Sequence, residues 1–101
     1  MNAGDILFKG AETYRERAKV YGDNWRRVGP VMEALRPGGF DLRTPDDHNR
    51  FHILMLAVVK LTRYVENWDK GGHADSTLDL SVYAAMLNAI DAEIEVREDK
   101  A

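Results

Sequence analysis

Two cations and two carboxylates stand in segments whose other residues are mostly apolar. Lys60 and Arg63 interrupt the apolar run from 51 to 65, and Asp75 and Asp79 open the next apolar-patterned segment. A charge in such a segment is costly unless it is paired or bound to something. The four charges therefore either neutralise one another or hold a charged ligand, and this choice decides the function.

The two aspartates are one helical turn apart, where like charges repel unless a cation lies between them. Mg²⁺ is commonly held by one or two carboxylates together with substrate phosphates, so Asp75 and Asp79 are candidate metal ligands. The alternative for Asp75, which we favour, is an N-cap or first-turn residue stabilised by the helix dipole. The alternative for Asp79, equally good, is a salt bridge to Lys60 or Arg63.

The cations lie on one helix face with His52, at spacings of three and four residues. Lys60 and Arg63 are donors of the kind that phosphates prefer, and His73, after two glycines, is a third candidate contact. The alternatives are a solvated face and an exposed loop histidine. The pair His48 and His52 could chelate a metal, but without a third ligand the zinc interpretation is poor.

A compact turn from 21 to 25 has an aromatic residue at each end. Tyr21 could stack on a base while Asp23 or Asn24 reads its edge, and Tyr83, on the face of Asp79, is a further candidate base contact. The alternative, which we favour, is a helix–helix turn whose aromatic residues enter the core.

Helical spacing of apolar residues predicts an all-α chain with four helices in an antiparallel bundle. Asp5 is the expected N-cap of the first helix, which ends at Tyr21, and Asp23 or Asn24 can cap the next helical segment. The segment 25–35 should kink at Gly29-Pro30 or start afresh at Pro30. Residues 36–43 form a loop.

Thr44 and Pro45 are the clearest helix start in the chain, and two aspartates come directly after them. This third helix should run to Trp68 or Asp69 and be central and mostly buried. Its expected apolar stripe is Phe51, Leu54, Val58, Leu61, Val65 and Trp68. The last helix starts near Ala74 or Asp75 and carries two apolar faces, one with Leu78, Val82, Ala85, Ala89 and Ala92 and one with Tyr83, Leu87, Ile90 and Ile94.

The 101 residues fit one domain, with a core over about 5–95 and a polar tail from 97 to 101 that should fray. The net charge of -3 disfavours nucleic acid, and Pro30 argues against a helix-turn-helix despite four arginines between 25 and 43. There are no cysteines, so thiolate chemistry is excluded. The start has no signal-peptide pattern and no apolar run is long enough for a bilayer, so we expect a cytoplasmic protein and no membrane partner.

Together these segments resemble an uncharacterised family of small phage and prophage proteins. The resemblance is carried by Tyr21-Gly22-Asp23, by Lys60-Leu61-Thr62-Arg63, and by the block His73-Ala74-Asp75-Ser76-Thr77-Leu78-Asp79 with Tyr83, and it covers roughly 5–92. That family is in turn similar to the MazG-like all-α nucleotide pyrophosphohydrolases, which hold Mg²⁺ with helical E-x-x-E and E-x-x-D motifs.

The resemblance implies a MazG-like fold, a dimer or tetramer, and binding of a nucleotide or another phosphorylated small molecule. Asp79 matches the last acid of E-x-x-D, but Ser76 replaces its glutamate, and Lys60 and Arg63 stand where E-x-x-E is expected. A degenerate Mg²⁺-dependent pyrophosphohydrolase is thus one hypothesis. The alternative is a non-enzymatic protein, a host-defence inhibitor or a nucleotide-sequestering protein in the host cytoplasm, whose Lys/Arg/Asp cluster is structural.

Overall fold

The chain is built entirely from helices in the computed structural model, which describes residues 1–100. The order is α1 (Ala3–Tyr21), η1 (Asn24–Arg26), α2 (Val28–Leu35), α3 (Pro45–Glu66), η2 (Trp68–Lys70) and α4 (Ala74–Lys100). The predicted all-α class with four α-helices is therefore confirmed, and the described residues contain no strand.

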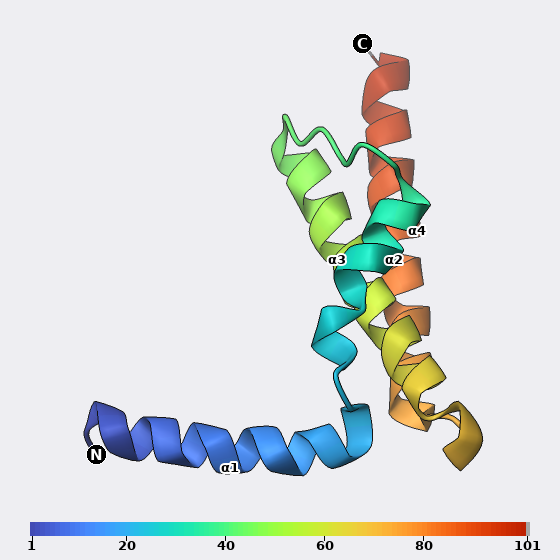
Figure 1. The fold of residues 1–101 in the computed structure, drawn as a ribbon. Coiled ribbons are helices and arrows are strands. Elements are labelled where there is room, and N and C mark those ends of the chain that lie inside the picture. Colours follow the sequence, from blue (N-terminus) through green and yellow to red (C-terminus); the bar gives the residue numbers. More distant parts are fainter. Residues whose placement is uncertain (101) are drawn as a thin grey trace.

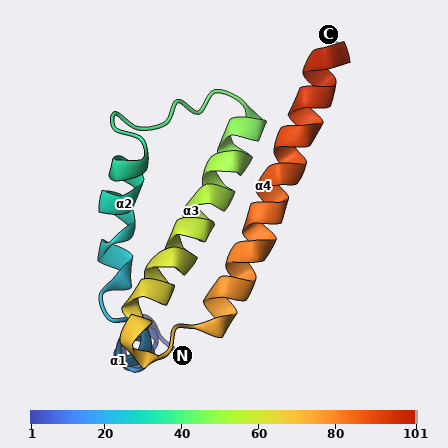
Figure 2. The same ribbon diagram turned by 90° about the vertical axis from the view of Figure 1, so that its right-hand side faces the viewer.

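Three of the helices, α2, α3 and α4, lie side by side in a single layer with α3 in the middle (Figure 2). They run in alternating directions, as expected for an antiparallel arrangement. The first helix, α1, leaves the end of this layer and projects away from it (Figure 1). One chain alone therefore does not place four helices alongside one another.

The helix starts are determined by local hydrogen bonding. Asn2, not Asp5, caps α1: its side chain accepts from the Asp5 N–H at 3.0 Å, and the Asp5 carboxylate accepts from the Asn2 N–H at 3.1 Å. The prediction of Asp5 as N-cap is therefore wrong by three residues, because Asp5 forms the other half of a capping box. At α3 the prediction is confirmed, with Thr44 as N-cap and Pro45 at the first position.

The region around Gly29-Pro30 also differs from expectation. The helix starts at Val28, two residues before Pro30, and continues through it to Leu35. Pro30 is tolerated because a first-turn residue has no intrahelical acceptor for its N–H. Neither expected cap acts through its side chain, since Asp23 makes no capping hydrogen bond and η1 already includes Asn24.

The last helix, α4, is helical to Lys100, and the expected fraying of residues 97–101 stays a prediction; Ala101 lies outside the described residues. Arg97 donates to Asp46 at 2.5 Å, and Arg50 pairs with Asp91 at 3.0 Å. These ion pairs tie the last turns of α4 to the first turns of α3.

The core is small. Among the described residues, Ala57 and Val58 of α3 are the buried apolar side chains, and α1 contributes none. The expected stripe of α3 is covered only in part, because Leu61, Val65 and Trp68 are exposed.

The radius of gyration is 17.4 Å, against about 13 Å for a compact chain of this length. No helix among the described residues is both long and apolar enough to cross a membrane.

Candidate functional site

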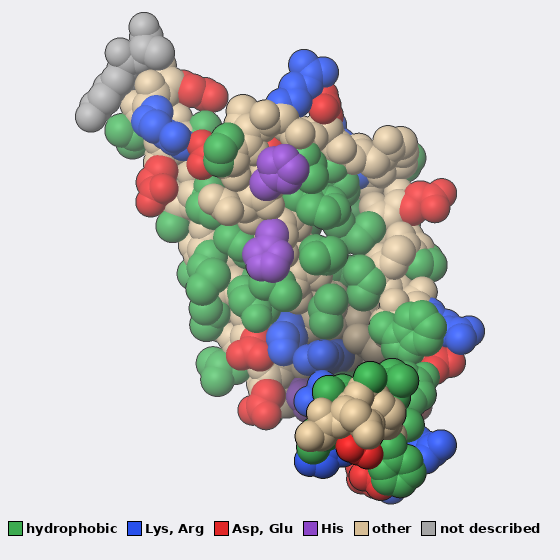
Figure 3. All heavy atoms as spheres, turned by 90° about the vertical axis from the view of Figure 1, so that its left-hand side faces the viewer, with side chains coloured by type: hydrophobic (Ala, Val, Ile, Leu, Met, Phe, Trp, Pro, Cys, Tyr) green, Lys and Arg blue, Asp and Glu red, His purple; other side chains and the backbone are tan. Residues whose placement is uncertain are grey.

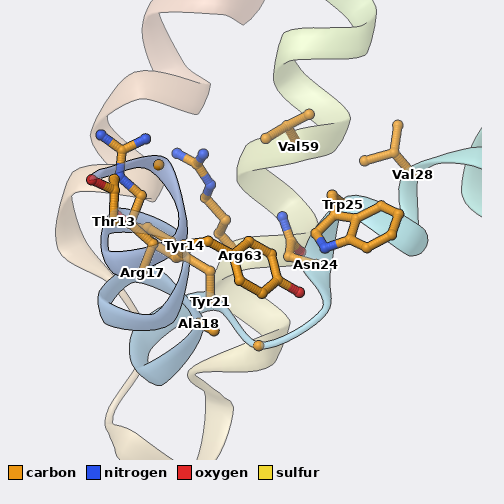
Figure 4. Close-up of a pocket in the computed structure, with 12 residues that line it drawn as sticks. Thr13, Tyr14, Arg17, Ala18, Tyr21, Asn24, Trp25, Val28, Val59 and Arg63 are labelled. Carbon is orange, nitrogen blue, oxygen red and sulfur yellow. The ribbon is translucent and has the colours of Figure 1, made fainter. Parts of the chain in front are cut away.

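A cavity of about 520 Å³ lies where the second half of α1 meets η1 and α3. It is lined by cationic, aromatic and amide side chains from all three elements (Figure 4). Its volume is within the range of about 300–1,000 Å³ that is typical of small-molecule sites. The side chains that bear on its chemistry are Arg17, Tyr21, Asn24, Trp25 and Arg63.

Asn24 is the most deeply placed polar residue of the cavity, with 5% of its surface exposed. The 3-10 turn holds it in place, because its carbonyl accepts from the Arg27 N–H at 2.9 Å. Its side-chain oxygen, Oδ1, is buried and has no hydrogen-bond partner among the described residues. A buried acceptor left without a donor costs about 1–3 kcal/mol, so this atom is suited to receive a donor from a ligand.

Arg63 enters the cavity from α3, and it too has a buried side-chain atom without a hydrogen-bond partner among the described residues. Its guanidinium lies over the ring of Tyr21, 4.4 Å from the ring centre, and its Nε is buried with no acceptor in the part of the chain that the structure describes. The other edge of this cluster is His73, whose ring meets Tyr21 edge to face at 5.7 Å. His73 is oriented by Ser76, with Nδ1 and Oγ 2.6 Å apart.

The structure therefore brings together three of the predicted site residues: Tyr21, Arg63 and His73. It also places Asn24 and Trp25 of the predicted turn in the cavity wall, and it adds Arg17 from α1, which had not been predicted as a ligand contact. Arg17 was missed because a charged residue on an amphipathic helix is usually solvated. The only available signal was its spacing of one turn from Tyr21, which gained meaning once α3 was known to pass nearby.

The other predicted residues lie elsewhere. Lys60 points to α4 and pairs with Asp79 at 2.9 Å, with only 15% of the lysine side chain exposed. Asp75 is exposed in the first turn of α4, where the helix dipole favours a carboxylate. Asp23 is exposed and accepts from the Tyr14 hydroxyl at 3.5 Å, and Tyr83 is half-buried on α4. None of these five residues lines the cavity.

The turn between α1 and η1 is fixed by a close backbone approach. Gly22 has a positive φ of 58° and lies directly against the carboxylate of Glu66 at the end of α3. Glu66 pairs in turn with Arg27 at 2.6 Å. A side chain at position 22 would meet both the φ penalty and the Glu66 carboxylate, so glycine is required where α1 turns to form the cavity wall.

The described acidic residues form no cluster that could hold a metal ion by itself. In residues 1–100 no three His, Asp or Glu side chains gather closely enough to hold an ion. Asp79 is already neutralised by Lys60, and Asp75 stands alone in an exposed turn. A Mg²⁺ ion at Asp75 and Asp79 would therefore depend on the phosphate oxygens of a bound substrate for its further ligands.

Electrostatically, the neighbourhood of the cavity is basic. In the space-filling view, Lys and Arg side chains gather where α1, seen end-on, meets the helical layer (Figure 3). Arg17 and Arg63 contribute two cations to the cavity wall, and Arg26 lies over the ring of the neighbouring Trp25 at 4.7 Å. A ligand with an anionic group and a flat ring would meet arginines for the anion and aromatic rings for the flat ring.

Comparison with known proteins gives no relative to argue from. No protein-family model, curated protein or solved structure matches the chain. The assignment of function therefore depends on the site alone.

Proposed function

We propose that the chain binds a nucleotide, or a similar phosphorylated small molecule with a flat ring, in the cavity between α1, η1 and α3. One observation carries the proposal: the two buried side-chain atoms without a hydrogen-bond partner in the described residues, Asn24 Oδ1 and Arg63 Nε, belong to residues lining this one cavity. An acceptor and a cationic donor together suit a ligand that has both an N–H group and an anionic group.

Each role is assigned from the chemistry of the group. Arg17 and Arg63 supply guanidinium donors for phosphate oxygens. Tyr21 and Trp25 offer ring faces and edges for a base, and the Asn24 amide presents a donor and an acceptor to a base edge. The motif Lys60-x-x-Arg63 is thereby divided: Arg63 faces the ligand and Lys60 secures α4 through Asp79.

The direct test is titration of the full chain with a panel of ribo- and deoxyribonucleoside mono-, di- and triphosphates, monitored by Trp fluorescence. Trp25 lines the cavity and Trp68 does not, so the variant Trp68→Phe leaves one reporter in the site. We expect saturable quenching, which Arg17→Gln weakens. Arg15→Gln, the loss of another exposed arginine two positions away on α1, is the matched control and should bind normally. No quenching or thermal shift with any nucleotide would refute the proposal.

Hydrolysis is a separate question. The resemblance to MazG-like enzymes favours a Mg²⁺ ion at Asp75 and Asp79. These are only two carboxylates, and Asp79 is paired with Lys60, which favours nucleotide binding without hydrolysis. Repeating the titration with Mg²⁺ and with EDTA, and measuring pyrophosphate release, tests both. Nucleotide binding that depends on Mg²⁺ in the wild type and is weakened by Asp75→Asn would support the metal site. Release of pyrophosphate would support the degenerate hydrolase.

A second candidate, the non-enzymatic interaction protein of a phage, is favoured by the Lys60–Asp79 ion pair. The pair lies between α3 and α4 and fits a structural role for half of the charge cluster. The variant Asp79→Asn tests the role of this pair, and the absence of nucleotide binding by the wild-type chain would favour the second candidate over the first. A loss of stability with nucleotide binding retained supports the structural role, and a loss of binding with stability retained supports the ligand site. A host protein is the expected partner of this alternative.

A homo-oligomer is the assembly that we propose for either function. The apolar surface exposed by the single chain supports it, as does the position of α1 outside the layer of the other helices. A MazG-like four-helix arrangement would then be completed between copies rather than within one.

A further inference from the structure

The helix α1 has an apolar side but almost nothing to pack against in its own chain. Ile6, Leu7, Phe8 and Tyr14 are all exposed, Leu7 by 74%. The apolar spacing of Leu7, Ala11, Tyr14 and Ala18 defines an α1 stripe, which meets the rest of the chain only near its end at the cavity. Most of the stability of a helix in a protein comes from packing of its apolar face, so the first half of this 19-residue helix needs a partner surface.

A second free apolar surface lies on α4. Of the two faces expected from its sequence, the one with Tyr83, Leu87 and Ile90 is half-buried in the helical layer. The other, which we name the α4 stripe, consists of Leu78, Val82, Ala85 and Ala89 and is exposed along its length. Hydrophobic side chains are visible along the α4 edge of the face from which α1 projects (Figure 3).

The amount of exposed surface indicates what kind of partner is missing. The chain exposes 7694 Å², about 1,900 Å² more than the roughly 5,800 Å² expected for a folded monomer of 11.5 kDa. If two copies each buried this excess, the interface would total about 3,800 Å². That value lies within the roughly 2,000–5,000 Å² of obligate homodimers.

The charges of the two helices favour the same pairing. The helix α4 carries seven acidic and two basic residues, whereas α1 carries four basic and three acidic ones. Both stripes belong to every copy, so a two-fold arrangement satisfies both at once. The exposed α3 residues Leu61, Val65 and Trp68 are a poorer match for α1. Leu61 and Val65 line a small cavity with Val31 of α2 and thus adjoin α2.

We infer that the protein is a dimer in which the α1 helices are exchanged, the α1 stripe of each copy packing on the α4 stripe of the other. Because the second half of α1 also forms a wall of the cavity, each ligand site is stabilised by the body of the partner copy. This inference concerns assembly and stands whether or not the cavity binds a nucleotide.

Light scattering and native mass spectrometry of the full chain test the assembly. We expect a dimer at micromolar concentration, converted to monomer by Leu7→Glu and by Val82→Glu. The control Leu35→Glu changes a similarly exposed leucine on α2, outside both stripes, and should remain dimeric. A monomeric wild-type chain would overturn the inference and leave the stripes to a different partner, as would a dimer unaffected by both stripe variants.

Cross-linking tests the pairing even if the charged variants fail to fold. The chain has no cysteine, so introduced thiols are unique. Copies with Leu7→Cys are mixed, under oxidising conditions, with copies carrying Leu78→Cys, Val82→Cys or Ala85→Cys. A mixed disulfide with at least one of the three supports the exchange. A disulfide formed only between two Leu7→Cys copies would place α1 against α1 and overturn the α4 assignment.

Discussion

The two ends of α3 differ in whether their polar groups have hydrogen-bond or ion-pair partners. At the first end, Thr44 and Asp47 cap the helix, and Asp46 and Arg50 reach across to α4 in ion pairs. At the last end, near Arg63, the structure leaves two buried side-chain atoms without partners among the described residues. The polar groups of the first end stabilise the fold, whereas those near the second end are available to a ligand. Stability and binding should therefore respond to different substitutions.

The substitution Arg63→Met is expected to have the largest effect on binding. A charge-assisted hydrogen bond contributes about 1.5–3 kcal/mol, so nucleotide affinity should fall about 10- to 100-fold. Met keeps most of the side-chain volume against the Tyr21 ring, so the thermal midpoint should change little. Titration with the best ligand of the panel and differential scanning calorimetry measure the two quantities.

Lys60→Met is the natural control, since it removes the other cation of the Lys60-x-x-Arg63 motif. Met fills the buried space of the lysine stem, and the Asp79 carboxylate left behind is half-exposed and can be hydrated. The free energy of unfolding should therefore fall by only about 1 kcal/mol while nucleotide affinity stays near wild type. Equal losses of affinity in the Lys60 and Arg63 variants would mean that the motif acts as one phosphate clamp, contrary to the proposed division of roles.

Asn24→Leu should lower nucleotide affinity less than Arg63→Met does. It should distinguish an effect on binding from an effect on folding more clearly. A neutral hydrogen bond is worth about 0.5–1.5 kcal/mol, which corresponds to about a 2- to 10-fold loss. Replacing an unsatisfied buried amide by an apolar group of similar shape should leave stability unchanged or raise it. A strongly destabilised variant would indicate that Asn24 is a structural residue and would count against the ligand site.

The same contrast explains which parts of the chain could be predicted from the sequence. Local signals were sufficient at Thr44-Pro45, where cap, proline and first-turn acids all act within a few residues. They misplaced the start of α1, because Asn2 and Asp5 are both capping residues and sequence alone does not rank them. They also gave no sign of the ion pairs that join the last turns of α4 to α3, since the α3 partners stand about 40 to 50 positions earlier in the chain.

The candidate site was predictable only in part for a related reason. Tyr21, Arg63 and His73 could be selected by residue type and spacing, but their meeting depends on where α1 turns at Gly22. The sequence pattern grouped Lys60, Arg63, Asp75 and Asp79 as one cluster, whereas Lys60 and Arg63 face different neighbours. A difference of three residues on a helix is enough to turn one side chain toward α4 and the other toward α1.

Thr44→Ala tests the opposite end of α3 and should affect stability alone. Loss of the side chain that accepts from the Asp47 N–H at 3.1 Å should lower the free energy of unfolding by about 1 kcal/mol. Nucleotide affinity should not change, because the cap lies at the far end of α3 from the cavity. Urea denaturation and the fluorescence titration, done on the same preparation, give both values.

The smallest expected effect is the pH dependence of this cap. The Arg43 N–H donates to the Asp47 carboxylate at 3.0 Å, with a further bond from the Thr44 N–H, and this holds the pKa of Asp47 below its ordinary value of 3.8. A carboxyl whose pKa is lower in the folded state stabilises the chain when ionised, and this contribution is lost as the pH falls through the folded-state pKa. The Tm difference between wild type and Asp47→Asn should therefore be constant from neutral pH down to about pH 5 and shrink below the ordinary pKa. Asp69→Asn, which removes one exposed carboxylate from η2, controls for net charge. A difference that persists unchanged into strong acid would mean that the Asp47 side chain acts by packing rather than by its charge.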